Sequence, residues 1–587
     1  MRACLPLLLL AANTNATPDP PPGPERLPNA LDPTGTGLVP HNDSCFAPNP
    51  KGEPFSATFA PRYPDVAPRY HICNSCHSEN DPCAAFYYKG VYHYMYQEHD
   101  NGGITGGHVV SRDLVTWQEL SPSLWPDKWY ISAAVWDFSA TIVDGVPTII
   151  AAGVVAPGAK KNESDPNSQW CHALAQPTNL SDPKLVDWHY PSDRNPTMCG
   201  TKENGLTPGD SPSNTWRTIG GEYRYVDAYG LVYTSMDFRH WTQAANASAL
   251  PVGSSFPIGC CQDLYPLPPP CDGCAGEYLG EGSPKTPTHV WSGWPPGTPG
   301  VYELIRYHEG PVNSSGVREV LPLGLAALGL NFTWHDWGHF AATKSFHDPV
   351  HDRRIVAGWL APDVTVPGAP LQFKYNTQSL LREVRYDPRL RVLTTFPVAE
   401  TEQLRGAAPL ATVPAGMKLS SARNHTLVAS GANQTEVRLK LRLEPWPTAP
   451  ISVGLRVMTA NASSTDGVEL YVTLYPPPSA DAKVWQARAV SNRTSMHGPT
   501  MAGLFPVIAG EDIEVAVYID NTWIEWFVNG GRFAQTVAVP GQALTGGAEQ
   551  GVVLWTNATG GVNVDGAAWA MRSIWHNSTT HDRPPPA

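Results

Sequence analysis

The sequence is short of charge, and of positive charge above all. Asp, Glu, Lys and Arg make up only 16% of its 587 residues, and 53 acidic residues outnumber 40 basic ones, for a net charge of −13. This balance disfavours nucleic acid or an anionic membrane surface as a partner. After the N-terminus no apolar run approaches the ~18 residues of a membrane-spanning helix. We therefore expect a soluble mature protein that engages neither nucleic acid nor membrane.

Cysteine is missing from the C-terminal half of the chain. Apart from Cys4 the cysteines are Cys45, Cys73, Cys76, Cys83, Cys171, Cys199, Cys260, Cys261, Cys271 and Cys274. An even number in a chain that looks exported favours disulfides, whose pairing the sequence leaves open. The pairs Cys73/Cys76 and Cys271/Cys274 also have the spacing of zinc ligands, but they are far apart in the sequence and an oxidising compartment is expected. We expect no metal and no organic cofactor.

The N-terminus, "MRACLPLLLLAANTNA", combines a positive residue, a short apolar run and small residues near Ala16. This pattern predicts a signal peptide over residues 1–16, the alternative being an apolar strand. Sequons for N-glycosylation support export. They lie at Asn15, Asn42, Asn162, Asn179, Asn246, Asn313, Asn331, Asn424, Asn433, Asn461, Asn492, Asn557 and Asn577. We expect an N-glycosylated protein that is secreted or lies in the secretory pathway or vacuolar lumen.

Turn-forming and aromatic residues are abundant, with 51 Gly, 60 Pro and 20 Trp. Together with short alternating runs they predict an all-β protein. Residues 65–405 contain two similar units, "HVVSRDLVTW" and "LVYTSMDFRHW", and such long-spaced repetition is typical of propeller blades. Longer alternation over residues 415–578, with a hairpin turn at Asn529-Gly530-Gly531, predicts a β-sandwich. Residues 17–64 are a Pro-rich extension, and 579–587 a disordered tail.

Several stretches together resemble glycoside hydrolase family 32, the invertase, inulinase and levanase family. They are "NDPCAAFYYKGVYHYMYQ", "GGHVVSRDLVTW", "LWPDKWYISAAVWDFSATIVDGVPTIIAAG", "DWGHFAATKSFHDPVHDRRIVAGWLAPD", "QSLLREVRYDPRLRVLTTFPVAETEQLRG" and "VYIDNTWIEWFVNGGR". The resemblance implies a five-bladed β-propeller followed by a β-sandwich. It also implies hydrolysis of terminal β-fructofuranosyl bonds with retention, by one carboxylate that attacks the sugar and a second carboxyl group that protonates the leaving oxygen.

The family motif NDPNG matches "NDPCA", which implies that Asp81 is the nucleophile and that Asn80 lies in the fructose pocket. Gln97 matches a position near the sugar. Without the resemblance, Asn-Asp-Pro would be read as a common turn. The motif RDP matches "GDS", so Asp210 takes the position of the transition-state stabiliser, although Gly209 replaces the arginine.

The acid/base motif departs most from the family. Its glutamate position falls on Cys260 in "GCCQDLYPL", and a thiol, with a pKa near 8.5, is a poor acid at secretory pH. Asp263, Glu277 and Glu281 are nearby carboxyl groups, with no spacing that selects one. Cys260 could pair with Cys83 across the pocket, or with Cys271 or Cys274.

Two further positions, Trp136 and Ser139, are expected to bind substrate in an aromatic wall that differs from the family's. The resemblance favours a secreted β-fructofuranosidase acting on sucrose or fructans. Cys260 favours a catalytically silent carbohydrate-binding homologue, and a fructosyltransferase or another five-bladed glycosidase is a third reading. Carbohydrate is the expected ligand in each case, and the oligomeric state stays open.

Overall fold

The computed structural model describes most of the chain between residues 68 and 575. The described residues are 68–74, 79–99, 104–156, 170–200, 208–217, 220–244, 260–267, 288–294, 304–309, 333–360, 377–387, 390, 392–459, 467–492, 501–539 and 550–575. The expected signal peptide, the N-terminal extension (17–64) and the tail (579–587) lie outside these residues. Within them, no helix has both the length and the apolar character needed to cross a membrane.

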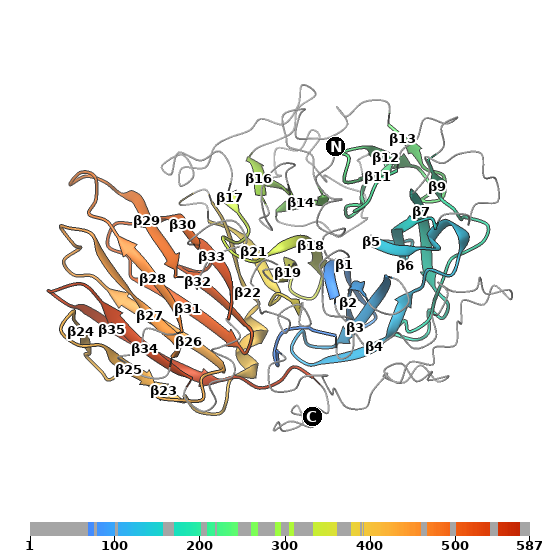
Figure 1. Ribbon diagram of the computed structural model, residues 1–587. Helices are drawn as coiled ribbons and strands as arrows, with labels where there is room; N and C mark the ends of the chain where they lie inside the picture. The colour runs from blue at the N-terminus through green and yellow to red at the C-terminus, as the bar shows by residue number, and fades with distance from the viewer. Residues whose placement is uncertain are drawn as a thin grey trace.

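The first half of the fold is a five-bladed propeller of antiparallel sheets (Figure 1). Blade one holds β1 (Glu79–Tyr88), β2 (Val91–Glu98), β3 (Thr105–Ser111) and β4 (Trp117–Leu124). Blade two holds β5 (Ala134–Val143), β6 (Val146–Val154), β7 (Trp170–Pro177), β8 (Trp188–His189) and β9 (Met198–Cys199), and the 3₁₀-helix η2 (Trp129–Ile131) precedes it. Blade three holds β10 (Trp216–Arg217), β11 (Tyr223–Val226), β12 (Val232–Ser235) and β13 (Thr242–Gln243).

Blades four and five complete the ring. Blade four holds β14 (Cys260–Leu267), β15 (Thr288–Trp294), β16 (Leu304–Glu309) and β17 (Thr333–Trp334). Blade five holds β18 (Ala341–Asp348), β19 (Arg353–Leu360), β20 (Thr377–Gln378), β21 (Arg382–Asp387) and β22 (Val392–Pro397), followed by the 3₁₀-helix η6 (Ala399–Leu404). The first strands of neighbouring blades touch, since β1 contacts β5 and β18, and β14 contacts β18. They therefore surround the centre of the propeller.

Each of these four first strands begins with a shift in pairing register. The shifts involve Pro82–Ala84 in β1, Val135–Phe138 in β5, Cys260–Asp263 in β14 and Ala341–Lys344 in β18. A register shift bends a strand and redirects its side chains. The same irregularity thus turns side chains from several blades toward the centre.

The two similar units, which share a Ser-x-Asp-x-x-x-Trp pattern, form the same turn in blades one and three. Asp113 accepts hydrogen bonds from the backbone N–H groups of Val115 (2.9 Å) and Thr116 (2.7 Å). Asp237 accepts the equivalent bonds from Arg239 and His240, both at 2.9 Å. These aspartates shape turns, so the repeat that pointed to blades is structural.

The second half is a sandwich of two sheets (Figure 1). One sheet holds β23 (Ala411–Thr412), β24 (Lys418–Leu419), β26 (Gln434–Arg442), β31 (Ile513–Asp520), β32 (Trp523–Val528), β33 (Phe533–Ala538) and β35 (Val562–Ala570). The other holds β25 (His425–Val428), β27 (Ile451–Thr459), β28 (Val468–Leu474), β29 (Val484–Ser491), β30 (Met501–Ile508) and β34 (Gly551–Thr556). The hairpin predicted at Asn529-Gly530-Gly531 joins β32 to β33, and all three residues have positive φ.

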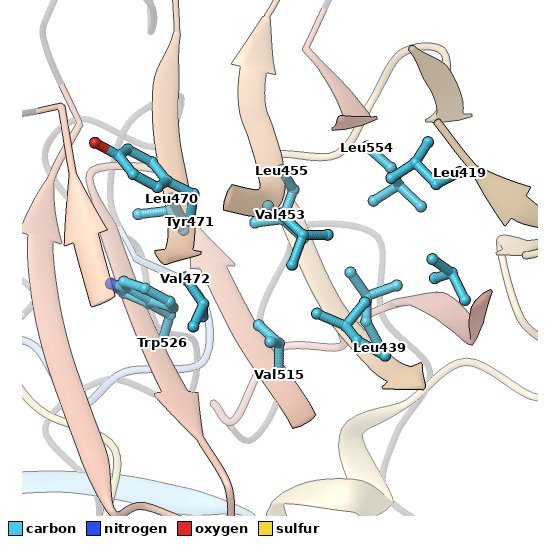
Figure 2. Close-up of a pocket in the computed structure, with 13 residues that line it drawn as sticks. Leu419, Leu439, Val453, Leu455, Leu470, Tyr471, Val472, Val515, Trp526 and Leu554 are labelled. Carbon is cyan, nitrogen blue, oxygen red and sulfur yellow. The ribbon is translucent and has the colours of Figure 1, made fainter. Parts of the chain in front are cut away.

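The core of the sandwich contains a small apolar gap between its two sheets. Leucine and valine side chains from both sheets line it, with Trp526 and Tyr471 on one side (Figure 2). Its volume is only about 10 Å³, which is about the space that one water needs. This gap is a packing defect and cannot hold a sugar.

A buried charged cluster joins propeller to sandwich. His71 contacts Asp520 (2.7 Å) and Glu525 (2.9 Å), and Arg382 pairs with Glu525 and with Asp336 (2.9 Å), all with fully buried side chains. Buried ions are tolerated only when they are paired and hydrogen-bonded. Each buried charge of this cluster has its partner on the other unit or beside it, so the cluster holds propeller and sandwich together.

Candidate active site at the centre of the propeller

Asp81 lies near the start of β1 and is half-buried. The thiol of Cys261, from the first strand of blade four, donates to its Oδ2 over 3.6 Å. The Sγ atom of Cys83 lies 3.3 Å from the carbonyl oxygen of Asp81. One thiol thus contacts the carboxylate of Asp81, and a second contacts its backbone carbonyl.

A second carboxylate, Asp137, faces the same space from β5 of blade two. Ligand-type atoms of Asp81, Asp137 and Cys261 all lie within 4.8 Å of one another. Asp137 is fully buried and accepts hydrogen bonds from the side chains of Gln97 and Ser211. Sequence reasoning missed it, although it stands directly after Trp136 on a strand expected to line the pocket.

Asp210 comes from the segment that leads into blade three. It is buried, and its Oδ1 accepts a hydrogen bond from the backbone N–H of Ser211 (2.7 Å). Ser211 has φ +55°, which turns its hydroxyl toward Asp137 and toward Cys261 (3.9 Å). Asp210 is therefore next in the chain to a residue that touches the Asp81 cluster.

The missing arginine before Asp210 has a local explanation. A Cβ atom on Gly209 would lie 2.6 Å from the ring of Tyr229, so a side chain at this position requires that ring to move. The carbonyl of Gly209 accepts a hydrogen bond from Nε2 of buried His172 (2.7 Å). Burial lowers the pKa of His172 to about 4, so the ring is neutral at neutral pH and supports the loop as a hydrogen-bond donor.

A lysine enters the centre from blade five. Lys344 is buried and donates from Nζ to the carbonyl of Pro212 (2.8 Å), two residues after Asp210. Burial and the carboxylates of Asp137 and Asp81 raise the pKa of Cys83 well above its usual value, and Lys344 opposes this shift. Cys83 therefore remains a thiol, and Lys344 is a cation that the sequence patterns did not single out.

The expected acid/base strand places a different cysteine against Asp81. Cys261 has φ +59° and is buried. Cys260 pairs through its backbone with Trp294, but its side chain lies outside the described residues, as do Glu277, Glu281, Cys271 and Cys274. Cys83 is a thiol, which contradicts the disulfide considered between Cys83 and Cys260, because its sulfur faces Asp81 and Asp137 instead.

Asp263 binds Ser345 of blade five. It is fully buried and accepts hydrogen bonds from the backbone N–H (2.7 Å) and the hydroxyl of Ser345. Burial raises its pKa, and the charges of Arg354 and Lys344 oppose that change. It ties blade four to blade five.

The remaining expected pocket residues have mixed surroundings. The backbone carbonyl of half-buried Asn80 accepts a hydrogen bond from Gln378 (2.7 Å). Half-buried Trp136 packs edge-on against Trp170, with ring centroids 5.0 Å apart. Ser139 is buried, and its hydroxyl has no hydrogen-bond partner among the described residues. Gln97 alone of these reaches the carboxylate cluster.

The cysteines expected in disulfides divide into two kinds. Cys171 and Cys199 form a disulfide. Cys73, Cys83 and Cys261 are buried outside any disulfide, so the expectation of general pairing was wrong for them. Two of these three thiols contact the carboxylates of the site, Cys261 that of Asp81 and Cys83 that of Asp137.

The arrangement of a five-bladed propeller followed by a β-sandwich is shared with other solved structures. Fructan 1-exohydrolase IIa from Cichorium intybus superimposes with a TM-score of 0.67 at 21% identity, over 87% of this chain and 98% of that one. A GH32 beta-fructofuranosidase from Bombyx mori gives a TM-score of 0.59 at 18% identity, over 87% and 95%. These likenesses establish the fold.

The family follows from the sequence match. Residues 71–397, more than half of the chain, match the glycosyl hydrolases family 32 N-terminal domain, and the chain belongs to that family. A cell wall beta-fructofuranosidase from Zea mays is 31% identical over 64% of this chain and 62% of its own length. An acid beta-fructofuranosidase from Vicia faba is 28% identical over 86% and 80%. The match spans less than two thirds of the Zea mays enzyme and 56% of a beta-fructofuranosidase from Arabidopsis thaliana, CWINV4.

Proposed function

We propose that this protein hydrolyses terminal β-fructofuranosyl bonds of sucrose or fructans with retention, with Asp81 as nucleophile. The observation that carries the proposal is the convergence of side chains on Asp81. The Sγ atom of Cys261, from blade four, lies 3.6 Å from its Oδ2. A carboxylate oxygen of Asp137, from blade two, lies within 4.8 Å of a carboxylate oxygen of Asp81. A half-buried carboxylate at the centre of a propeller can meet a sugar that enters from solvent. Membership of family 32 supports this chemistry.

In this proposal Asp81 attacks the anomeric carbon and Asp210 stabilises the transition state. The short bond from the backbone N–H of Ser211 holds the Asp210 carboxylate in place. Asn80, Gln97, Trp136 and Ser139 bind the sugar. Gln97 supports this role best, because its amide already lies against a pocket carboxylate.

Fructose release from sucrose and from inulin by the purified protein tests the proposal. We expect release by the wild type and a loss of at least about 10⁴-fold in Asp81→Ala, the scale seen when a catalytic nucleophile is removed. A wild-type protein that binds these sugars but releases no fructose would contradict the proposal.

A catalytically silent carbohydrate-binding protein is the second candidate. The specific observation in its favour is that cysteines occupy the family's acid/base strand, at Cys260 and at Cys261 beside Asp81. Under this reading Asp81→Ala leaves sugar binding intact, the wild type is inactive, and Cys260→Glu creates activity. The assay above and calorimetric binding of the same sugars separate the two candidates.

We also infer that the protein is exported and N-glycosylated. Of the five sequon asparagines in the described residues, Asn179, Asn424, Asn492 and Asn557 are exposed and Asn433 is half-buried, and the Cys171–Cys199 disulfide fits an oxidising compartment. Expression in a eukaryotic secretory host tests this. Retention in the cytosol, or no mass change after endoglycosidase treatment, would contradict it.

A further inference from the structure

The two carboxyl groups at the centre lie too close together for an inverting glycosidase, which leaves the retaining arrangement. One oxygen of Asp81 and one of Asp137 lie within 4.8 Å. Retaining enzymes hold nucleophile and acid/base about 5–5.5 Å apart, whereas inverting enzymes leave room for a water between them, at roughly 6.5–9.5 Å. Asp81 and Asp137 are therefore spaced for a reaction in which one attacks and the other transfers the proton.

A chain of contacts also connects the two carboxyl groups. Ser211 Oγ contacts an oxygen of Asp137 and lies 3.9 Å from Cys261 Sγ, which in turn lies 3.6 Å from Asp81 Oδ2. A serine hydroxyl can accept as well as donate. A protonated Asp137 can thus donate to Ser211, which donates to Cys261, while the thiol donates to ionised Asp81. The contacts accommodate one protonated and one ionised carboxyl group at once.

We propose that Asp137 is the general acid/base of this protein and replaces the glutamate that the acid/base strand has lost to Cys260. This inference rests on the proposed function. Asp137 follows Trp136 in the chain and accepts a hydrogen bond from the Gln97 side chain, and the family resemblance places both of those residues in the sugar pocket. The catalytic carboxyl group has moved from blade four to blade two.

The reaction then runs in two balanced steps. A carboxylate oxygen of Asp81 forms a bond to the anomeric C2 of the fructosyl unit, the C2–O bond to the leaving group breaks, and its electron pair takes the proton of Asp137. In the second step water attacks C2 and gives a proton back to Asp137. The bond between C2 and Asp81 breaks, which releases fructose and restores the Asp81 carboxylate.

Other nearby groups are less suited to carry the proton. Asp263 is bound to Ser345 by two hydrogen bonds in the interface between blades four and five. Cys83 has a pKa raised well above its usual value by burial and by the neighbouring carboxylates, and a thiol that holds its proton so firmly is a weak acid at the pH of the secretory pathway. Asp137 carries a carboxyl group that the contacts through Ser211 and Cys261 connect to Asp81.

Asp137→Asn tests the inference, because the amide keeps the shape of the carboxyl group and can keep contacts with Gln97 and Ser211. We expect kcat on sucrose or inulin to fall about 10²–10⁴-fold, the usual contribution of a general acid. An aryl β-fructofuranoside with a good leaving group needs no proton in the first step. The variant should therefore release one equivalent of phenol per enzyme at a rate within about tenfold of the wild type, and then slow down.

Two further readouts separate catalysis from folding. Added azide, which needs no general base, should restore turnover of the aryl substrate by the variant and yield fructosyl azide. The alkaline limb of the wild-type pH profile should disappear in Asp137→Asn. The control is Asp565→Asn, an isosteric change at a half-exposed carboxylate of the sandwich, which should leave activity and melting temperature unchanged.

The outcomes also separate this inference from the proposed function. An active wild type whose Asp137→Asn variant keeps full kcat on sucrose, or loses equal rate on sucrose and the aryl substrate without azide rescue, would overturn the inference alone. A wild type inactive on every fructoside would overturn both.

Discussion

At the scale of single residues, the centre of the propeller joins two carboxylates and two thiols, and a third carboxylate, Asp210, is hydrogen-bonded to the adjacent Ser211. Asp81, Asp137 and Asp210 come from three blades, and Lys344 supplies positive charge from a fourth. Uncharged side chains that hold the loops of the site by hydrogen bonds are part of this centre as well. His172 is the clearest example, because it links Gly209 to Tyr225 through both ring nitrogens at 2.7 Å.

Replacing His172 by Ala should lower the free energy of unfolding by about 1–3 kcal/mol, because the Gly209 carbonyl and the Tyr225 hydroxyl lose a buried partner. Urea unfolding at pH 7 measures the change. Exposed His189→Ala is the matched control. Equal stability of the two variants would show that the His172 contacts contribute nothing.

Asp81 and Asp210 could be proposed as site residues from the sequence because each lies in a short contiguous motif. Asp137 could not, because its partners Gln97, Ser211 and Cys261 are brought to it only when three blades close around one axis. The same holds for Lys344. Because Cys260 and Cys261 are adjacent, the sequence also left open which of them faces the nucleophile. The positive φ of Cys261 and the register shift in β14 turn the thiol of Cys261 toward Asp81.

At the scale of elements, blade two is fastened by a covalent bond. The Cys171–Cys199 disulfide joins β7 to β9, two paired strands. The short β9 is only two residues long, so few backbone hydrogen bonds hold it. The disulfide fixes that edge of the blade whose first strand carries Asp137.

The double variant Cys171→Ser/Cys199→Ser should lose about 3–4 kcal/mol of stability, the loop-closure entropy expected for a separation of 28 residues. Thermal unfolding with and without reductant measures the loss, and Cys73→Ser controls for removal of a buried thiol. Wild-type unfolding that is insensitive to reductant would contradict this account of the blade edge.

The five-bladed propeller was expected from the family resemblance, whereas the all-β class and the sandwich were predictable from the sequence because turn chemistry and alternation are local. The Asn529-Gly530-Gly531 hairpin shows this well.

At the scale of the whole molecule, propeller and sandwich depend on the buried cluster around His71. Burial lowers the pKa of this histidine, but hydrogen bonds to Asp520 and Glu525 outweigh that effect and raise it to about 9. The folded pKa exceeds the unfolded value near 6.5, so the protonated ring stabilises the fold fully below pH 6.5, and this stabilisation is lost as pH rises through 9.

The free energy of unfolding should therefore fall by about 3 kcal/mol between pH 6.5 and 9, since one pKa unit corresponds to about 1.4 kcal/mol. His71→Gln should be less stable than wild type at pH 6.5 and should lack this fall. Urea unfolding at both pH values measures it, with exposed His240→Gln as control. A wild-type stability that stays constant or rises over this range would contradict the interface account.

The central claim is that Asp81 forms a covalent bond to fructose, and mass spectrometry of the trapped intermediate tests it most directly. The Asp137→Asn protein is mixed with an aryl β-fructofuranoside, quenched in acid during the slow phase and digested with protease. The account predicts one added fructosyl unit on the peptide that contains Asp81, absent in Asp81→Ala/Asp137→Asn. A fructosyl unit on another carboxylate, or phenol release with no adduct on any peptide, would contradict it.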